Sequence, residues 1–417
     1  MTALPLVTTA SAPRNQISDA ALEFQVFEDL AATGIPQAQW DEFVESHRGD
    51  IYFSWEWLRT WWDFYGKGRI CRILVFRAGG RLVGIVPLMI FRVWVGPVPV
   101  RVARLLGADS TIVVLNPPVV ADLAAEIYAQ TIEHALMQER CDVISLAPLS
   151  GEGRAGVYAR AAAERLGSHA CLVRARSIGV HSVFHLPPTG DAYLASLSKS
   201  ERGNYRRDER RLQESFSLDF RSLGALDQLE TEFDRFVELH QVQWRMAGKL
   251  GHFGDWPLST AFAKTLVRRL APMGGANIDV FCASGRAVVY EFDFVFGDAH
   301  YWRLTSRVVN EEMEKRGIGR VTFVRRVLAM ISKGIRRIEG GSGHYDYKLR
   351  LGATEYPLES VVVAANRPLS LAKSRLLLAW SDWLNLAYYR VWFQRIAPRL
   401  PRFLRRPLWK SWIRSRL

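Results

Sequence analysis

An internal repeat constrains the fold of this 417-residue chain more than any other feature. The segment FRAGGRLVGIVPLMIF at residues 76–91 and the segment FCASGRAVVYEFDFVF at residues 281–296 carry identical residues at six positions, at a constant offset of 205. Each copy reads as a strand, a Gly-containing tight turn and a longer second strand, which is typical of a β-hairpin. The chain therefore presents two similar hairpins far apart in the sequence.

A second match lies upstream of each hairpin. DEFVESH at 41–47 resembles DRFVELH at 234–240, with apolar residues at helical spacing in both. Downstream of each hairpin another helix and strand follow, at 121–138 and 142–147 in the first copy and at 320–333 and 335–339 in the second. Because the matches occur in the same order, we predict a duplication of an α+β unit, each a mostly antiparallel mixed sheet flanked by helices.

Composition narrows the class of protein. Hydrophobic residues make up 49% and charged residues 23% of the chain, which suits two packed domains. The net charge is +13, but residues 366–417 hold twelve Lys and Arg against the single acid Asp382, so the preceding chain carries only +2. This distribution argues against DNA binding by the body and indicates that the tail alone contacts an anionic surface. Four separated cysteines without a C-x-x-C pair favour a reducing cytoplasm.

A glycine-containing loop is the strongest candidate for ligand binding. The second copy runs from a strand at 298–306 through the loop 314–320, Glu-Lys-Arg-Gly-Ile-Gly-Arg, into a helix. Backbone N–H groups at such a helix start can bind phosphate, and the helix dipole favours the anion. We predict a pyrophosphate cradle made of Arg316, Gly317, Ile318, Gly319 and Arg320. The alternative is a helix start whose glycines serve packing alone.

This order of strand, Arg-Gly-x-Gly loop, helix and strand resembles the pyrophosphate-binding motif of GNAT acyltransferases. The wider chain, from about residue 40 to 364, is similar to the CelD/BcsL-type family, which pairs two GNAT-like halves as FemAB-type proteins do. Besides the loop, the resemblance rests on FSWEWLRTWWDFYG at 53–66, LSKSERGNYRRDERRLQ at 197–213 and GHYDYKLRLG at 343–352. It implies two tandem GNAT-like halves and acetyl-CoA or another acyl-CoA as co-substrate. Glu314 stands where GNAT cradles usually carry Gln or Arg.

Acyl transfer needs a base for the attacking group, stabilisation of the oxyanion and a proton for the departing thiolate. In Tyr-Glu-Phe-Asp-Phe at 290–294, the strand period places Glu291 and Asp293 on one face, with the aromatic residues on the core face. We predict a carboxylate base there; a solvated polar face is the alternative. His344 is a second candidate base, and Tyr345 and Tyr347 are candidate acids. Each tyrosine also fits a core position with a polar tip.

Four further residues are predicted to bind substrate: Arg206, Arg210, Trp302 and Lys348. The two arginines lie in a charged helix, 199–213, which either contacts an acceptor phosphate or RNA, or forms a solvated face rich in ion pairs. His181 and His185 are too far apart along a strand for chelation, and we predict no metal.

The sequence divides into four predicted regions: a disordered lead at 1–20, a first GNAT-like domain at 21–185 without a cradle, a second, catalytic one at 186–365, and a basic Trp- and Arg-rich helical tail at 366–417. The tail either lies on an anionic membrane surface or folds back over the body. No signal peptide or spanning segment is evident, so we expect a cytoplasmic protein, peripheral at the inner face of the membrane if the tail binds lipid.

The function predicted from these observations is acyl-CoA-dependent N- or O-acylation of an envelope or exopolysaccharide-related acceptor, a sugar or an amine. Two alternatives stay open. One is FemAB-like transfer from an aminoacyl-tRNA, which the basic helix at 199–213 favours. The other is a non-catalytic scaffold associated with a membrane polysaccharide synthase.

Overall fold

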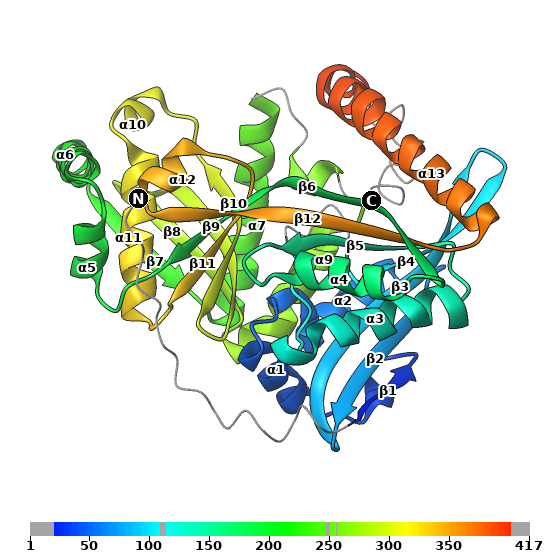
Figure 1. Ribbon diagram of the computed structural model, residues 1–417. Helices are drawn as coiled ribbons and strands as arrows, with labels where there is room; N and C mark the ends of the chain where they lie inside the picture. The colour runs from blue at the N-terminus through cyan, green and yellow to red at the C-terminus, as the bar shows by residue number, and fades with distance from the viewer. Residues whose placement is uncertain (1–20, 109–113, 247–250, 256, 402–417) are drawn as a thin grey trace.

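The computed structural model describes residues 21–108, 114–246, 251–255 and 257–401 (Figure 1). The predicted lead at 1–20 and the end of the tail from residue 402 lie outside the described residues. Within the described chain, twelve strands form one continuous sheet in the order β1-β2-β3-β4-β5-β12-β6-β11-β10-β9-β8-β7. The strands are β1 (Leu22–Phe27), β2 (Ile70–Ala78), β3 (Arg81–Val95), β4 (Val98–Leu105), β5 (Val143–Ser150), β6 (Ala170–His185), β7 (Leu218–Leu223), β8 (Ala276–Ala283), β9 (Arg286–Phe296), β10 (Ala299–Arg307), β11 (Arg337–Ser342) and β12 (Ala353–Ala365).

Helices cover the sheet and form the tail. The α-helices are α1 (Gln37–Ser46), α2 (Trp55–Tyr65), α3 (Ala124–Glu133), α4 (Ala155–Arg165), α5 (Gly190–Ser196), α6 (Lys199–Ser215), α7 (Leu226–Met246), α8 (His252–Asp255), α9 (Ser259–Leu270), α10 (Glu311–Lys315), α11 (Ile318–Ser332), α12 (Asp346–Arg350) and α13 (Pro368–Trp383). Short 3₁₀ turns are η1 (Ala31–Thr33), η2 (Ile51–Phe53), η3 (Ala121–Leu123), η5 (Ala271–Met273) and η7 (Ala397–Arg399), and η4 (His134–Gln138) and η6 (Leu384–Ile396) are π-helical.

The two predicted hairpins have the same geometry down to an irregularity in the ladder. In β2–β3 the register shifts between Phe76 and Arg77, and in β8–β9 it shifts between Phe281 and Cys282, at the same offset of 205. In both halves the fourth strand then pairs in parallel with the fifth, β4 with β5 and β10 with β11. A bulge changes the local twist, so a bulge at equivalent positions is a strong mark of common geometry. The prediction of two tandem α+β halves with a helical tail is confirmed.

The halves exchange their last strands. β12, from the end of the second half, pairs with β5 of the first half, and β6, from the end of the first half, pairs with β11 of the second. β6 and β12 also pair with each other in an antiparallel ladder that runs along most of both strands. The predicted domain boundary at 185/186 therefore falls at the end of a strand that belongs structurally to both halves.

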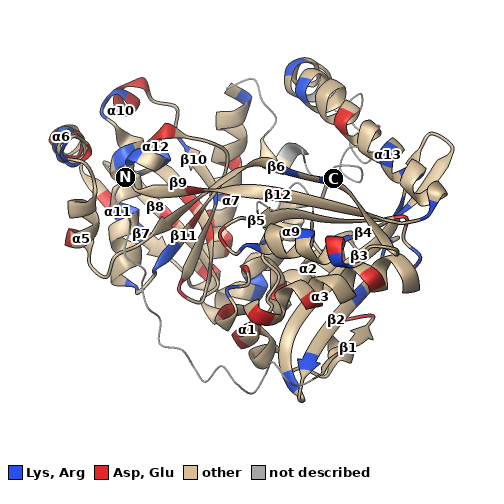
Figure 2. Ribbon diagram, viewed as in Figure 1, with Lys and Arg blue, Asp and Glu red and all other residues tan. Residues whose placement is uncertain are grey.

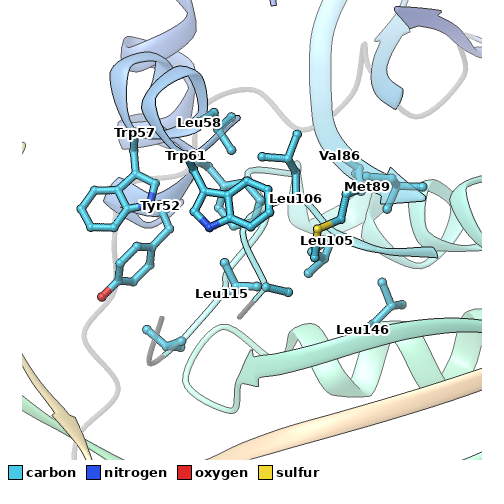
Figure 3. Packing of buried hydrophobic residues seen from close by; sticks show 14 of the residues in the cluster. Tyr52, Trp57, Leu58, Trp61, Val86, Met89, Leu105, Leu106, Leu115 and Leu146 are labelled. Atoms are coloured by element: carbon cyan, nitrogen blue, oxygen red, sulfur yellow. The ribbon is translucent and has the colours of Figure 1, made fainter. Parts of the chain in front are cut away.

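An aromatic cluster packs the two halves together. Trp57 of α2 is fully buried, and its ring lies edge-on to Phe294 of β9 at 5.1 Å, to Phe262 of α9 at 6.0 Å and to Tyr52 of η2 at 4.9 Å. Figure 3 shows Trp57 and Trp61 side by side above the strands of the first half. Large aromatic side chains bury much apolar surface, so this cluster joins residues more than 200 positions apart into one core.

The exchange predicts that weakening β12 weakens both halves. Leu358 of β12 is 5% exposed inside the core cluster. We expect Leu358→Ala to lower the free energy of unfolding by about 2–5 kcal/mol. Unfolding followed by tryptophan fluorescence and by far-UV circular dichroism should give one coincident, shifted transition.

Leu369→Ala is the matched control, because Leu369 on α13 is 68% exposed and the change should cost less than about 0.5 kcal/mol. Two separated transitions in the Leu358→Ala protein would contradict the interdependence of the halves.

Candidate active site

The predicted cradle forms the N-terminus of α11. Gly317 precedes the helix with φ of +74°, a left-handed conformation that favours glycine, and its N–H donates to the Glu314 carbonyl at 3.0 Å. The next two amides, of Ile318 and Gly319, find no acceptor in the described part of the chain. Free N–H groups at the positive end of a fifteen-residue helix suit an anion.

Acidic side chains from α6 already contact this loop. Arg320 forms ion pairs with Asp208 and, at 3.2 Å, with Glu201. A Cβ atom built on Gly317 would lie 2.3 Å from Asp208 Oδ2, so the carboxylate rests directly against the glycine. Arg316 points away from the loop, to Glu312 at 2.9 Å and to the Arg211 carbonyl at 3.0 Å. A phosphate at the Ile318 and Gly319 amides would therefore need Asp208 to withdraw.

Glu314, the residue that departs from the GNAT pattern, is held beside the loop by an ion pair. Its carboxylate pairs with Arg307 of β10 at 3.0 Å. Arg307 itself lies beside the loop, because a Cβ on Gly319 would meet its guanidinium at 3.2 Å. Glu314 therefore holds the guanidinium of Arg307 next to the free amides of Ile318 and Gly319.

Glu291 and Asp293 share one face of β9, as predicted, but that face is buried beneath α11. Their exposed fractions are 4% and 0%, so the alternative of a solvated polar face is excluded. Tyr290, Phe292 and Phe294 occupy the opposite face and are buried in the core, as expected. Two carboxylates can be buried here because a cationic side chain of the helix lies against them.

That cation is Arg326 of α11, which sequence reasoning missed. Its guanidinium lies 2.5 Å from Asp293 Oδ2, 3.6 Å from Glu291 Oε2 and 3.4 Å from Asp279 Oδ2, and the side chain is 1% exposed. His300 Nε2 is 3.1 Å from Asp293 Oδ2. One signal was available, since Arg326 falls on the apolar face of its helix between Phe323 and Met330. A charge on the apolar face of a helix needs a buried partner.

Glu291 is held in place by two side chains of β10. Its Oε2 accepts hydrogen bonds from Trp302 Nε1 at 2.8 Å and from Thr305 Oγ1 at 2.6 Å. Burial raises the pKa of Glu291 to about 7; Arg326 opposes this rise and Asp293 adds to it. A carboxylate with such a pKa is suited to proton transfer near neutral pH.

Trp302 and Lys348 lie where β10 and β11 diverge. The parallel pairing of these strands ends at Tyr301 opposite Glu339. Beyond that point, Lys348 Nζ donates to the Gly340 carbonyl at 2.7 Å and lies 5.8 Å from the Trp302 ring and 4.6 Å from the Tyr345 ring. Lys348 is 4% exposed, and burial lowers its pKa to about 8, against the opposing effect of Glu339 and Glu355.

The two candidate tyrosines are close to this lysine, whereas the candidate histidine is not. Tyr345 and Tyr347 are 49% and 41% exposed, so neither occupies a core position, and their ring centroids lie 5.8 Å apart. Partial desolvation raises the pKa of Tyr347 to about 12, with Glu291 contributing. His344 is exposed and pairs with Glu355 at 2.9 Å and with Asp346 at 3.3 Å. The hydrogen bond and charge of Glu355 raise the pKa of His344, which favours the cation over a free base. The structure thus gathers Glu291, Trp302, Tyr345, Tyr347 and Lys348.

Arg206 and Arg210 lie on the outer side of α6. The buried side of this helix consists of Glu201, Tyr205, Asp208 and Leu212, whereas both arginines are exposed. Figure 1 shows α6 at the end of the molecule farthest from the first half. The two arginines therefore do not point between the halves, and Arg210 makes a long contact with Glu214 at 3.9 Å.

A second buried polar cluster, also missed, joins the two halves. His181 of β6 binds Glu339 of β11 through Nδ1 at 2.8 Å, and its Nε2 lies 3.3 Å from Ser150 Oγ of β5. Asp50, before η2, is 2% exposed, and its Oδ2 has no hydrogen-bond partner among the described residues. Burial raises the pKa of Asp50 to about 7, with Arg337 opposing and Glu339 reinforcing the rise. No three metal-ligating side chains of the described chain are grouped to hold an ion.

Asp50 makes a testable contribution to the pH dependence of stability. Its pKa is higher in the folded protein than in the unfolded chain, so folding is favoured at low pH and this contribution is lost as the pH rises through about 7. Asp50→Asn removes the ionisation. We expect the free energy of unfolding of the variant minus that of the wild type to rise between pH 4 and pH 8, by an amount on the order of 3 kcal/mol.

Urea titrations across this pH range measure the difference directly. Asp122→Asn, at an exposed position before α3, is the control and should give a flat difference. A flat difference for Asp50→Asn as well would show that Asp50 ionises normally in the fold.

The chain is similar to several known proteins. Residues 199–349 match the family model of the acetyltransferase (GNAT) domain. The structure aligns with the crystal structure of FemX at a TM-score of 0.60 and 12% identity, over 82% of this chain and 98% of that one. L-PGS from Bacillus licheniformis aligns at 0.47 and 12%, over 82% and 97%, and a tandem GNAT protein from the clavulanic acid biosynthesis pathway at 0.39 and 15%, over 84% and 99%.

The match over residues 199–349 supports a GNAT-family acyltransferase, and the alignment with FemX shows a similar fold. The search of curated proteins finds no match. The finer assignment to the CelD/BcsL-type family stays a prediction.

Proposed function

We propose that the second half transfers an acyl group from an acyl-CoA to an amine or hydroxyl of an acceptor. The observation that carries the proposal is that Trp302 contacts both Glu291, a buried carboxylate with a pKa near 7, and Lys348, a buried amine. Lys348 lies where β10 and β11 diverge, and Glu291 lies on the neighbouring strand β9. The helix whose Arg326 contacts Glu291, α11, begins with two free amides. The carboxylate can serve as the base and the lysine can stabilise the oxyanion, while the free amides offer a binding site for the phosphates of the donor.

The residues divide the work by their charge. In its ionised form, Glu291 can take the proton of the attacking N–H or O–H, directly or through a water molecule. Lys348 can stabilise the oxyanion that develops on the carbonyl oxygen, because a buried ammonium acts in a low dielectric. Tyr347 or Tyr345 can protonate the departing thiolate. Acyl-CoA would supply the activated carbonyl, and the Ile318 and Gly319 amides would hold its pyrophosphate, with Arg307 and Arg320 beside them.

The role of Glu291 can be tested by substitution. We expect Glu291→Gln to reduce kcat/KM for acetyl-CoA-dependent acetylation by 100-fold or more, because a positioned base contributes about 10²–10⁴. In the wild type, kcat/KM should rise with pH through about 7 as Glu291 ionises, and this rise should vanish in the variant. Acetylation of a panel of amino sugars and amines, followed by thiol release, provides the measurement.

The control for this substitution is Glu311→Gln on α10, because Glu311 is exposed and pairs only with Lys315, at 2.7 Å, among the described residues. It should leave the rate and its pH profile unchanged. Full activity of Glu291→Gln would remove Glu291 from the mechanism.

The acid at the cradle gives a second test. Asp208 competes with a pyrophosphate for Arg320, so Asp208→Asn should tighten CoA binding by several-fold, on the order of 1 kcal/mol. Gly317→Ala should weaken binding, because the position has a positive φ and no room for a Cβ. Isothermal titration with CoA measures both, and Asp191→Asn on α5 is an exposed control. Equal affinity of all four proteins would place CoA elsewhere.

Transfer from an aminoacyl-tRNA is the second candidate function. One observation favours it: Asp208 and Glu201 neutralise the cradle, while the exposed face of the adjacent α6 carries Arg206, Arg207, Arg210 and Arg211. Such a basic helix face suits a phosphate backbone better than a single cofactor. Retention of tRNA but not of CoA by the purified protein would select this alternative.

The acceptor is proposed to be a sugar or amine of the cell envelope or an exopolysaccharide, as the family resemblance implies. We propose a cytoplasmic location, with peripheral contact at the inner face of the membrane. No helix in the described ranges has the length and apolarity needed to cross a bilayer.

A further inference from the structure

The tail has one face packed on the body and one face directed outward. On the inner side, Ser374, Leu377 and Leu378 of α13 are buried, and both leucines belong to the core cluster of the body. Ser370 Oγ donates to Asp142 Oδ1 at 2.8 Å and Lys373 Nζ lies 3.2 Å from Asp142 Oδ2, which anchors the start of α13. The structure therefore shows the tail attached to the body along one side only.

Large apolar side chains follow the opposite side, here called the outer face. The members are Leu369, Leu376, Trp383, Leu386, Val391 and Ile396. Their exposure reaches 68% at Leu369, 59% at Leu386 and 52% at Trp383. Nothing in the described chain covers these residues.

The spacing of these residues changes with the type of helix. Leu369, Leu376 and Trp383 are seven apart, which is two turns of the α-helix α13. Leu386, Val391 and Ile396 are five apart in η6, a π-helix, where hydrogen bonds join residues i and i+5. Leu369, Leu376 and Trp383 therefore form a stripe along α13. Leu386, Val391 and Ile396 continue the exposed apolar face but turn gradually around η6, because five residues exceed one turn of a π-helix.

Positive charge accompanies this stripe. Arg375, Arg390 and Arg395 are exposed, and each directly precedes a member of the outer face. The acid in this part of the tail is Asp382, which pairs with Arg174 of β6 at 2.9 Å and with Arg176 at 3.0 Å. Figure 2 shows the basic residues spread along α13 and the helix beyond it. The outer face is therefore apolar, basic and free of uncompensated acid.

We propose that the outer face of the tail binds the surface of an anionic lipid membrane and lies in its interface. An extended stripe of Leu, Val, Ile and Trp, flanked by arginines whose guanidinium groups can reach lipid headgroups, is the pattern of an interfacial helix. Charge complementarity selects anionic lipid over neutral lipid. The attachment of the inner side to Asp142, Arg174 and Arg176 would hold the body close to the membrane surface. The proposal is independent of the reaction that the second half carries out.

The test uses the full chain and vesicle flotation. The wild type should float with vesicles of 70% phosphatidylcholine and 30% phosphatidylglycerol, bind pure phosphatidylcholine at least tenfold more weakly, and lose binding as salt increases. Leu369→Asp combined with Leu386→Asp should lower binding at least tenfold, and Arg390→Gln combined with Arg395→Gln several-fold.

Two matched controls keep the result interpretable. Met273→Asp places the same charge on an apolar side chain that is 52% exposed and contacts Gln37 of α1, away from the tail in Figure 1. Arg81→Gln combined with Arg286→Gln removes the same charge from exposed positions at the turns of the two hairpins. Both should bind like the wild type, and circular dichroism and thermal unfolding should show that every variant folds.

Several results would overturn the proposal: no binding of the wild type to either vesicle, equal binding to both, or tail variants that bind as well as their controls. The proposal would also be overturned if the outer face bound a second copy of this chain. In that case, sedimentation would show an oligomer that dissociates on Leu369→Asp and Leu386→Asp substitution, without flotation of the wild type.

Discussion

One buried guanidinium holds the candidate site together. Arg326 is 1% exposed and faces three carboxylates from two strands, Asp279 on β8 and Glu291 and Asp293 on β9. Without it, these three carboxyl groups would be buried beneath α11 with no guanidinium partner. The same helix that carries Arg326 begins with the free amides of Ile318 and Gly319. The position of α11 on the sheet therefore affects both the pKa of Glu291, through Arg326, and the location of the free amides.

The first half contributes to this site through the shared sheet. β11, which carries Glu339 next to the divergence from β10, is held on its other edge by β6, a strand that begins in the first half. The contact between His181 and Glu339 at 2.8 Å lies in this seam, close to Asp50. Through strand exchange, the first half supplies one strand of the sheet and part of the polar cluster behind the candidate site.

The sequence alone predicted what depends on short-range pattern. The hairpins, the helix that contains Val321 and Val324, and the shared face of Glu291 and Asp293 follow from periods of 2 and 3.6 residues. The exchange of β6 and β12 could not be predicted, because a strand has the same pattern whichever neighbour it pairs with. The contact of Asp208 with Gly317 joins residues more than 100 positions apart and leaves no local signal. Arg326 did leave one, as a charge on an apolar helix face.

The central claim is that Glu291 loses its proton near neutral pH, because burial raises its pKa by more than the charge of Arg326 lowers it. Difference infrared spectroscopy of the wild type against Glu291→Gln, across pH 4 to 9, observes the carboxyl group of this side chain directly. The account predicts a protonated-carboxyl band, absent from the variant, that disappears with a midpoint near pH 7. A midpoint near the ordinary glutamate value, below pH 5, would contradict the account, because Glu291 would then be a permanently ionised partner of Arg326 and a poor base.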